Sequence, residues 1–341
     1  MPRGGTTVAL DGFGVENGFD VFSAGVRAAA SEGLNIRVFG PAADLDFSDL
    51  PTVTVIDTIE SITNEDDPVP AVRSRPDASI VRAVADVKDG NSDAVVSLGS
   101  TGATMAAATF GLRRSKGVKR PALAAQIPLP GKPVLFLDVG ANLDVRAQHL
   151  VQFAYLGASF SKSVLGVSSP SVGLLSVGEE AGKGKEEVVE AHATLSESSE
   201  INFIGNVEGR DIPAATADVI VTDGFTGNIT LKAMEGAAKL VGSAISDAAR
   251  KNPVSAIGGL MMKPAMAGLK NDLHPDTTGG AILLGLRKVT VVGHGSSGAD
   301  GVANAIRLAA RAAKVDAPGL TEEMLHRVGA NRGAIDSDGA A

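Results

Sequence analysis

The chain contains no cysteine and no tryptophan among its 341 residues, and only 4% of the residues are aromatic. Without cysteine, the protein can form no disulfide, use no thiolate nucleophile and hold no metal through sulfur, which suits a reducing cytoplasm. The histidines lie far apart without the spacing of metal ligands, and they are His149, His192, His274, His294 and His326. We therefore predict no metal site.

The sequence also lacks long apolar runs and an excess of basic residues. Its opening stretch, "MPRGGTTVALDGFG", has an apolar run too short for a signal peptide, and no span approaches the ~20 apolar residues of a transmembrane helix. The formal net charge of −8 argues against a nucleic-acid surface, and an acidic partner would need a local basic patch. We expect a cytoplasmic protein, soluble or peripheral to a membrane, that binds no nucleic acid.

Short apolar runs bounded by Gly, Pro, Asn or Asp alternate with Ala-rich stretches of helical character. The runs include "DAVVSLG", "PVLFLDVG" and "DVIVTDG", and several runs are apolar throughout, as strands covered on both faces must be. Helices are predicted over residues 20–32, 77–89, 102–115, 145–165, 185–197, 227–250 and 299–313. This alternation predicts an α/β fold with a mostly parallel, doubly wound sheet, in which ligands bind beyond the carboxyl ends of the strands.

The domain organisation is predicted from composition and the absence of a linker. With 44% hydrophobic residues, the chain can bury a core as one large α/β unit or as two closely associated domains. No Pro- or Ser-rich linker divides it, so we predict a single unit over residues 1–330. The segment 250–280 departs from the alternation, and the tail 331–341 is expected to be disordered.

One turn pattern occurs twice. Residues 92–111 align without a gap on residues 217–236, which pairs Gly99 with Gly224, Thr101 with Thr226, and Gly102 with Gly227. Each copy places glycines and a threonine at a helix N-terminus, where free backbone N–H groups and the helix dipole favour an anion. We predict paired anion-binding loops at one edge of the sheet; the alternative is that both threonines only cap helices.

Other polar, glycine-bearing loops follow the predicted strands. "DVGANLDV" contains Asp138 and Asn142, and "DGFTGN" contains Asp223 and Asn228. The remaining candidates are Lys183 in "VGEEAGKGKEE", Asn206 in "GNVEGRD", and His294, Ser296 and Ser297 in "GHGSSGAD". The alternative roles are turn-closing side chains for the two aspartates and a structural histidine at position 294. A nucleotide phosphate loop is excluded, because "GEEAGK" has the wrong spacing and lacks the Ser or Thr that holds magnesium.

Several long motifs together resemble the PlsX family of acyl-ACP:phosphate acyltransferases. They are "GSTGATMAAA", "KRPALA", "LDVGAN", "GEEAGKGKE", "INFIGNVEGRD", "VTDGFTGN" and "HGSS", in the family's order and spacing. The resemblance implies a Rossmann-like three-layer α/β/α fold of the isocitrate dehydrogenase and phosphotransacylase kind, a homodimer and no cofactor. It also implies that inorganic phosphate and fatty acyl carrier protein react to give acyl phosphate and free carrier protein for phospholipid synthesis.

The resemblance suggests roles for the loop residues. Lys183, His294 and Asp223 are predicted to be catalytic. The predicted substrate-binding residues are Thr101, Gly102, Asp138, Asn142, Asn206, Thr226, Gly227, Asn228, Ser296 and Ser297. Lys183 is expected to meet phosphate, whereas Lys185, on the following helix, is expected to matter little. The chain departs from the family pattern where Val15, Glu16 and Ser100 replace Gly, Asp and Asn.

The segment 254–273 has apolar residues at roughly helical spacing. In PlsX relatives a projecting pair of helices is associated with membrane attachment, so a projecting helical segment is expected over 250–280. Membrane contact is predicted for Ile257, Leu260, Met261 and Lys263, with delivery of acyl phosphate to a membrane glycerol-3-phosphate acyltransferase. The alternative is dimer packing or a core helix.

Two further functions remain open from the sequence. One is a phosphate acetyl- or butyryltransferase that acts on acyl-CoA on a similar fold. The other is a non-catalytic PlsX-like regulator that binds acyl carrier protein or membrane without turnover. Thiol release from acyl carrier protein or from acyl-CoA would distinguish among the three.

Overall fold

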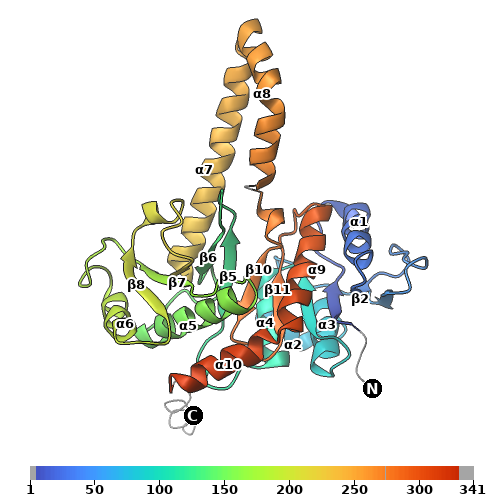
Figure 1. Ribbon diagram of the computed structural model, residues 1–341. Helices are drawn as coiled ribbons and strands as arrows, with labels where there is room; N and C mark the ends of the chain where they lie inside the picture. Colours follow the sequence, from blue (N-terminus) through green and yellow to red (C-terminus); the bar gives the residue numbers. More distant parts are fainter. Residues whose placement is uncertain (1–4, 273, 330–341) are drawn as a thin grey trace.

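A computed structural model describes residues 5–272 and 274–329, with all their side chains except those of 265, 267 and 269–272. The predicted disordered tail, 331–341, lies outside the described residues. An 11-stranded sheet forms the centre, in the order β3-β2-β1-β4-β11-β10-β5-β6-β9-β7-β8 (Figure 1). The strands are β1 Thr7–Asp11, β2 Asn35–Gly40, β3 Val53–Asp57, β4 Ala94–Ser97, β5 Ala122–Ile127, β6 Val134–Leu137, β7 Ser171–Leu175, β8 Asn202–Val207, β9 Val219–Val221, β10 Ala281–Leu284 and β11 Val289–Val292.

The helices agree closely with the predicted stretches. They are α1 Gly18–Ala30, α2 Pro68–Ser74, α3 Ser79–Lys88, α4 Thr101–Leu112, α5 Ala147–Ser163, α6 Glu186–Ser196, α7 Gly224–Arg250, α8 Pro253–Asp272, α9 Ala299–Lys314 and α10 Ala317–Arg327. Sequence analysis missed α2 and α10. The first is only seven residues long and contains two prolines, and the second begins with an Ala-Pro-Gly segment that resembles a turn.

Helices cover both faces of the sheet, because alternate strand residues point to opposite sides. On one face Val8 and Leu10 of β1 pack in a core with Phe22 of α1 and Ile306 of α9. On the other face Ala9 lies in a second core with residues of α3 and α4. The predicted three-layer α/β/α architecture is confirmed, and the central strands β4, β6 and β11 are buried throughout.

The sheet has two halves that run in opposite directions. In the first half β1, β2, β3, β4 and β11 are parallel, and in the second half β6, β7, β8 and β9 are parallel. Three antiparallel pairings, β11 with β10, β10 with β5, and β5 with β6, separate the halves. An odd number of reversals means that β4 and β9, which precede the two repeated turns, are antiparallel.

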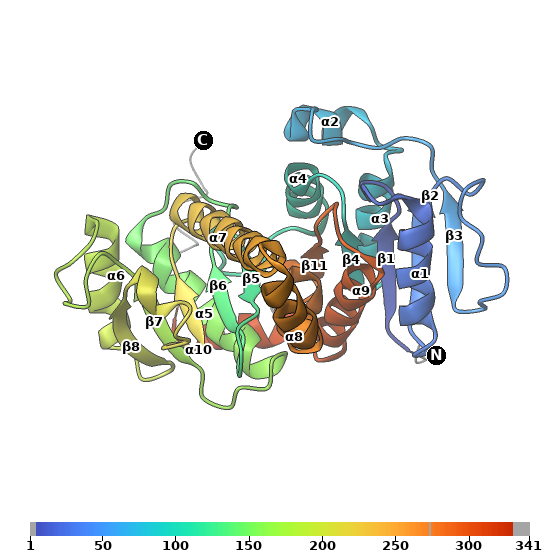
Figure 2. The ribbon, with the colours of Figure 1, turned by 90° about the horizontal axis from the view of Figure 1, so that it is seen from above.

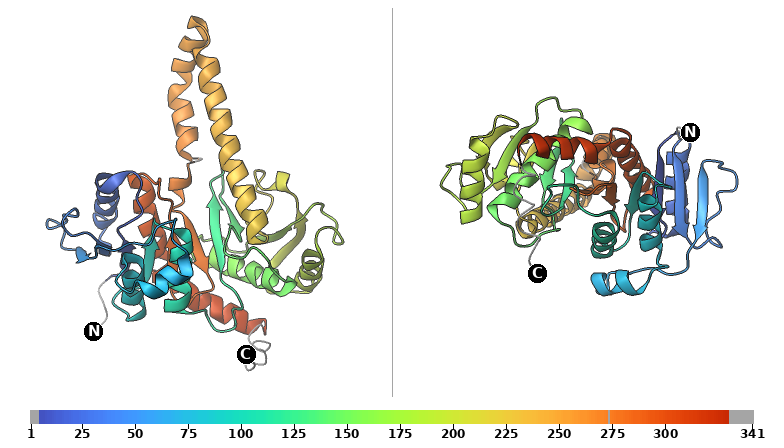
Figure 3. Two further views of the ribbon diagram at one scale, coloured as in Figure 1. Left: turned by 180° about the vertical axis from the view of Figure 1, so that it is seen from behind. Right: turned by 90° about the horizontal axis from the view of Figure 1, so that it is seen from below.

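Helix α10 connects the two halves. It packs against α5 of the second half and against α9 of the first half. Figure 3 shows it crossing beneath both halves when the molecule is seen from below. The two halves are therefore joined by a continuous sheet and by a helix that contacts both.

Helices α7 and α8 form a hairpin that projects from the body (Figure 1). Seen from above, the hairpin lies over the middle of the molecule, between the two halves (Figure 2). Its outer part has large exposed apolar side chains: Leu240, Val241, Ile245, Val254, Ile257, Leu260, Met261 and Met262. None of the helices in the described part of the chain is both long enough and apolar enough to cross a membrane.

Candidate functional site

A cavity lies at the carboxyl ends of β1, β4 and β11 in the first half. Its volume is about 380 Å³, and its walls are formed by loops 11–16, 61–64, 98–101 and 293–295 together with Ser79. We call these four loops the first loop group. Thr101 and His294, two of the predicted site residues, both line this cavity. The topology explains the convergence, because these three parallel strands end at the same edge.

Glycine is required where loops 11–16 and 98–101 of this group touch. Gly14 has a φ of +88°, and a Cβ at this position would lie 2.2 Å from the Gly99 Cα atom. The backbones are therefore in direct contact, and any side chain would push the loops apart. This contact brings the turn before α4 against the first loop of the chain.

Asp11 holds the base of the cavity. Its carboxylate accepts hydrogen bonds from Ser79 Oγ at 2.6 Å and from Ser97 Oγ at 2.8 Å, and its side chain is buried. Burial raises the pKa of Asp11 even though these hydrogen bonds act to lower it. Sequence analysis did not select Asp11 as a site residue. The pattern that could have identified it is an acid at the end of a buried strand, followed by glycine.

His294 is held by its own loop. Ser296 N donates to His294 Nδ1 at 3.1 Å, and Ser296 Oγ lies 2.8 Å from the same nitrogen. Because a backbone N–H can only donate, Nδ1 is the acceptor in a neutral ring, and the ring proton is assigned to Nε2. Ser297 differs from Ser296 in being buried, whereas the carbonyls of both serines accept from Asn17 Nδ2. Ser296 therefore orients the imidazole, whereas Ser297 holds the loop.

The helix caps are not the repeated threonines. Ser100 Oγ accepts from Ala103 N at 3.4 Å at the start of α4, and Asp223 caps α7. The capping alternative for Thr101 and Thr226 is therefore wrong. Gly102 instead provides room for α2, because a Cβ there would lie 2.7 Å from Pro68 Cγ.

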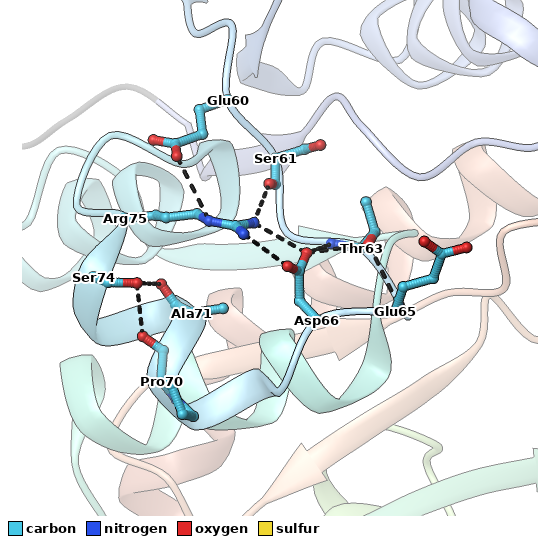
Figure 4. A network of polar contacts seen from close by, with 9 residues as sticks. All are labelled: Glu60, Ser61, Thr63, Glu65, Asp66, Pro70, Ala71, Ser74 and Arg75. Carbon is cyan, nitrogen blue, oxygen red and sulfur yellow. Dashed lines mark hydrogen bonds and ion pairs between the residues drawn. The ribbon is translucent and has the colours of Figure 1, made fainter.

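A network around Arg75 fixes the loop that forms one wall of the cavity (Figure 4). The guanidinium binds Asp66 at 2.7 and 3.0 Å and the Ser61 carbonyl at 3.2 Å, while Asp66 accepts from Thr63 N at 2.9 Å. The hydrogen bonds from Arg75 and then from Thr63 lower the pKa of Asp66 to about 2. Ser61 and Thr63 of this network line the cavity.

A second loop group lies in the other half, at the carboxyl ends of β6, β7 and β9. It consists of loops 138–142, 177–185 and 222–228. Asp138 is fully buried and accepts from the backbone N–H groups of Leu123, Gly140, Ala141 and Asn142 and from Asn142 Nδ2. Burial raises the pKa of Asp138 against these hydrogen bonds. With its oxygens occupied, Asp138 organises the loop rather than facing a substrate.

The first turn of α7 packs directly on this organised loop. Gly224 N donates to the Asn142 carbonyl at 2.7 Å. A Cβ at Gly227 would lie 1.9 Å from the Asp138 carbonyl oxygen, so only glycine fits there. Asn228 is exposed beside Gly140. The predicted residues Asp138, Asn142, Gly227 and Asn228 are thus brought together at the start of α7.

Asp223 is the centre of polar contacts in the second loop group. Its carboxylate accepts from Thr226 N at 2.7 Å, from Thr226 Oγ1 at 2.8 Å and from Lys185 Nζ at 3.2 Å. Burial alone would raise the pKa of Asp223, but the hydrogen bonds from Thr226 and Lys185 outweigh it and lower the pKa. The carboxylate therefore remains ionised, and the Thr226 hydroxyl is already engaged with it.

One of the two lysines of loop 177–185 differs from the expectation of the sequence analysis. Lys185 binds Asp223, although we expected it to matter little. Lys183 is exposed, and its ammonium has no ion pair in the described part of the chain. Between the two lysines the chain turns at Gly184, which has a φ of +108°. Asn206 Nδ2 holds the same loop by donating to the Glu180 carbonyl at 2.9 Å.

The structure brings the predicted residues together in two groups rather than one. The first loop group contains Thr101 and His294, and Gly102, Ser296 and Ser297 directly follow its loops. The second loop group contains Lys183, Asp138, Asn142, Asp223, Thr226, Gly227 and Asn228, and Asn206 of β8 binds its loop 177–185. No hydrogen bond or ion pair joins the two groups within residues 5–272 and 274–329. The prediction that the paired turns share one carboxyl edge is wrong, because their strands run in opposite directions.

The structure has a second cavity, and its described residues contain no cluster suited to a metal ion. A cavity of about 470 Å³ lies between α2, α3 and α4, with a mostly apolar lining that includes Phe110 and two cations, Arg73 and Lys88. Among the described residues, no cluster of three or more His, Cys, Asp or Glu side chains could hold a metal ion.

Comparisons with known proteins show extensive similarity. The family model described as "Fatty acid synthesis protein" matches residues 6–319. The phosphate acyltransferase of Elusimicrobium minutum is 47% identical over 269 residues, which cover 79% of this chain and 79% of that relative. The phosphate acyltransferase of Lactococcus lactis subsp. lactis is 39% identical over 327 residues, which cover 94% and 99%.

Solved structures are similar in fold. A phosphotransacetylase from Streptococcus pyogenes has a TM-score of 0.58 at 18% identity, with 91% of this chain and 94% of that chain covered. A branched-chain phosphotransacylase from Enterococcus faecalis V583 has a TM-score of 0.57 at 16% identity, with 90% and 99% covered. At such identities the likeness shows the fold alone, and it agrees with the predicted architecture.

Proposed function

Because the chain belongs to the Fatty acid synthesis protein family, which is the PlsX family of phosphate acyltransferases, we propose that it transfers a long-chain fatty acyl group from acyl carrier protein to inorganic phosphate. The products are acyl phosphate and free carrier protein, which serve phospholipid synthesis. The observation that supports this most strongly is the family match over residues 6–319. The two loop groups supply the chemistry that such a transfer needs.

The reaction requires positioning rather than a nucleophilic side chain. A phosphate oxygen attacks the thioester carbonyl carbon, so that a C–O bond forms and the C–S bond breaks. The electron pair leaves on sulfur, and with a thiol pKa near 8.5 the leaving group needs less help from an acid than an alkoxide would. The absence of cysteine is therefore no obstacle, since no acyl-enzyme is formed.

We assign the anion-binding role to the N-termini of α4 and α7 and to Lys183. Backbone N–H groups at a helix start favour phosphate. At α7 the N–H groups of Gly224, Thr226 and Gly227 already bind Asn142 and Asp223, so α4 offers more unbound N–H groups within the described residues. The Lys183 ammonium, without an ion pair among the described residues, is available to a phosphate. His294 donates from Nε2 to the oxyanion that develops on the carbonyl, with Ser296 holding the ring. Asp223 with Thr226, and Asp138 with Asn142, keep the α7 start in place.

We further propose that the protein is a homodimer in the cytoplasm and that the tip of the hairpin makes weak, reversible contact with a membrane. Ile257, Leu260 and Met261 are 63%, 69% and 79% exposed, and Lys263 lies beside them. Apolar side chains with a nearby cation suit an anionic lipid surface. Such contact would release acyl phosphate close to a membrane glycerol-3-phosphate acyltransferase.

A comparison of acyl donors tests the proposal. Purified protein is incubated with phosphate and either palmitoyl-acyl carrier protein or acetyl-CoA, and thiol release is measured. We expect release from the carrier-protein donor at a kcat/KM at least tenfold higher. A preference for acetyl-CoA would favour a phosphate acetyl- or butyryltransferase, and the absence of release from either donor would favour a non-catalytic regulator.

A further inference from the structure

A surface rich in unpaired cations lies at the junction of the two halves, although the chain has a net charge of −8. It is formed by the segment after α4, by the start of α5 and by the turn between β10 and β11. Its members are Arg113, Arg114, Lys116, Lys119, Arg120, Arg146, Arg287 and Lys288, and all but the half-buried Lys119 are exposed. We call this set the basic surface.

Backbone contacts hold these three segments together. Arg287 N donates to the Arg113 carbonyl at 3.1 Å, and Arg287 Nε donates to the Arg114 carbonyl at 3.1 Å. Arg114 also donates to the Lys119 carbonyl. Lys119 N donates to the Gln152 side chain of α5 at 2.9 Å. The cations are therefore gathered by the fold and are not merely neighbours in sequence.

The charges of the basic surface are not neutralised within the protein. In the described part of the chain none of its eight members forms an ion pair, whereas Arg37, Arg75 and Lys132 elsewhere each bind a carboxylate. The three segments contain one acid, Asp144, and Arg120 binds its backbone carbonyl rather than its carboxylate. Burial and then the charges of Arg120, Lys119 and Arg146 lower the pKa of His149 to about 4. An unneutralised positive field is thus present.

The basic surface adjoins the second loop group. Asn142 Nδ2 donates to the Pro121 carbonyl at 2.7 Å, next to Arg120, and Asp138 Oδ1 accepts from Leu123 N. Asn142 and Asp138 lie beneath the first turn of α7, as described above. A macromolecule bound at the basic surface would therefore stand beside the candidate site.

We propose that the basic surface is the docking site for the acidic carrier protein that brings the acyl thioester, an inference that rests on the proposed function. None of the cations of the basic surface lines either of the two cavities described above. The basic surface therefore suits an extended acidic face of a macromolecule better than a small anion. Complementary charge would steer the partner and fix its orientation, so that its thioester arm reaches the loops at the start of α7.

An anionic membrane fits the basic surface less well. Most exposed apolar side chains of the hairpin lie from Leu240 outward, and only Phe225 and Ile229 lie nearer the base of α7 among the described residues. Ile245 lies 21 residues beyond Gly224 in α7, which is about 31 Å at the rise of an α-helix. Figure 1 shows the hairpin tip far from the base of α7. At that base Asn142 binds both Gly224 and Pro121, which follows Arg120 of the basic surface. A membrane held at the tip would not reach these cations.

Charge reversal combined with direct binding tests the proposal. Lys116→Glu with Lys288→Glu changes two exposed cations whose side chains form no hydrogen bond or ion pair within the described residues. Lys162→Glu with Lys314→Glu, at the ends of α5 and α9, makes the same change of charge elsewhere. Binding of a fluorescent acyl carrier protein is measured by anisotropy at low and high salt, which does not require turnover.

We expect the first variant to weaken carrier-protein binding by about tenfold or more and to lose much of its salt dependence, while the control binds like the wild type. KM for palmitoyl-carrier protein should rise in parallel, while KM for palmitoyl-pantetheine, which has neither protein nor phosphates, should not change. If binding is lost but no donor is turned over in any variant, the proposed function fails and the docking surface stands.

Other outcomes would overturn the docking surface. They are equal binding by both variants, no carrier-protein binding by the wild type, and an equal rise of KM for palmitoyl-pantetheine, which would indicate damage to the site. A rise of KM confined to acyl-CoA would assign the surface to a nucleotide. Loss of binding to anionic vesicles with unchanged carrier-protein binding would assign it to a lipid surface.

Discussion

At the scale of single residues, the second loop group shows how a buried carboxylate can remain ionised. Asp223 is 8% exposed, yet two hydrogen bonds from Thr226 and one from Lys185 lower its pKa. Asp138 has more donors but is fully buried, and burial raises its pKa. The two carboxylates differ in depth of burial, and a lysine reaches only Asp223.

The first prediction separates the two lysines of loop 177–185. Lys185→Ala removes the cation at 3.2 Å from Asp223, so the pKa of Asp223 should rise. Activity that needs the ionised carboxylate should then be lost at a higher pH than in the wild type. Lys183→Ala should instead raise KM for phosphate more than tenfold without moving the acid limb. The profile of kcat/KM against pH measures both effects. If the acid limb of this profile does not move in Lys185→Ala, Lys185 does not control the ionisation of Asp223.

The second prediction concerns His149, whose pKa is lowered from 6.5 to about 4 by burial and nearby cations. As pH falls below 6.5, the unfolded chain takes up a proton that the folded chain binds only near pH 4. The stability contributed by neutral His149 is therefore complete above pH 6.5 and is lost between pH 6.5 and 4. Proton NMR titration should show the imidazole titrating near 4, and Arg120→Gln should move it upward. Titration near 6.5 in the wild type would contradict both the burial of His149 and the influence of the neighbouring cations.

At the scale of elements, the start of α7 depends on close packing that the sequence pattern did not show. The third prediction is that Gly227→Ala lowers the free energy of unfolding by about 3 kcal/mol, because its Cβ would meet the Asp138 carbonyl oxygen at 1.9 Å. Gly236→Ala on the same helix has no atom within 4 Å of its Cβ and should stabilise by roughly 0.5–1 kcal/mol. Urea unfolding measures both, and equal effects would contradict the packing argument.

The fourth prediction concerns the hairpin of α7 and α8. With anionic liposomes at low salt, the wild type should float partly, and Leu260→Glu with Met261→Glu should stay at the bottom while keeping its oligomeric state. Ser243→Glu with Ser246→Glu adds the same charge at exposed polar positions and should still float in part. If the first variant loses its oligomeric state instead, the apolar side chains pack against another copy of the chain.

At the scale of the whole molecule, the alternation of apolar runs and helices was enough to predict the α/β sheet and its three layers. It could not predict that β5 and β10 reverse the direction of the sheet, because an apolar run such as "AILL" has the same pattern in a parallel or an antiparallel pair. The repeated turns were therefore recognised correctly as a repeat but placed wrongly at one edge.

The sequence identified most loops that meet in the candidate site, since glycine and acids after buried strands are a local signal. Contacts between residues far apart in the sequence could not be predicted. The Lys185 bond to Asp223 spans 38 residues, and the Ser79 bond to Asp11 spans 68. The basic surface could not be predicted either, because Arg146, Arg287 and Lys288 lie near the 113–120 segment only in the folded chain.

The fifth prediction tests the central claim, that phosphate accepts the acyl group. Palmitoyl-carrier protein is incubated with the protein and ¹⁸O-labelled phosphate, and the products are identified by mass spectrometry while thiol release is followed. We expect one acyl phosphate per thiol, with the bridging oxygen from phosphate, and a rate that rises with phosphate until it saturates. Thiol release that is independent of phosphate, with free fatty acid as the product, would contradict the account.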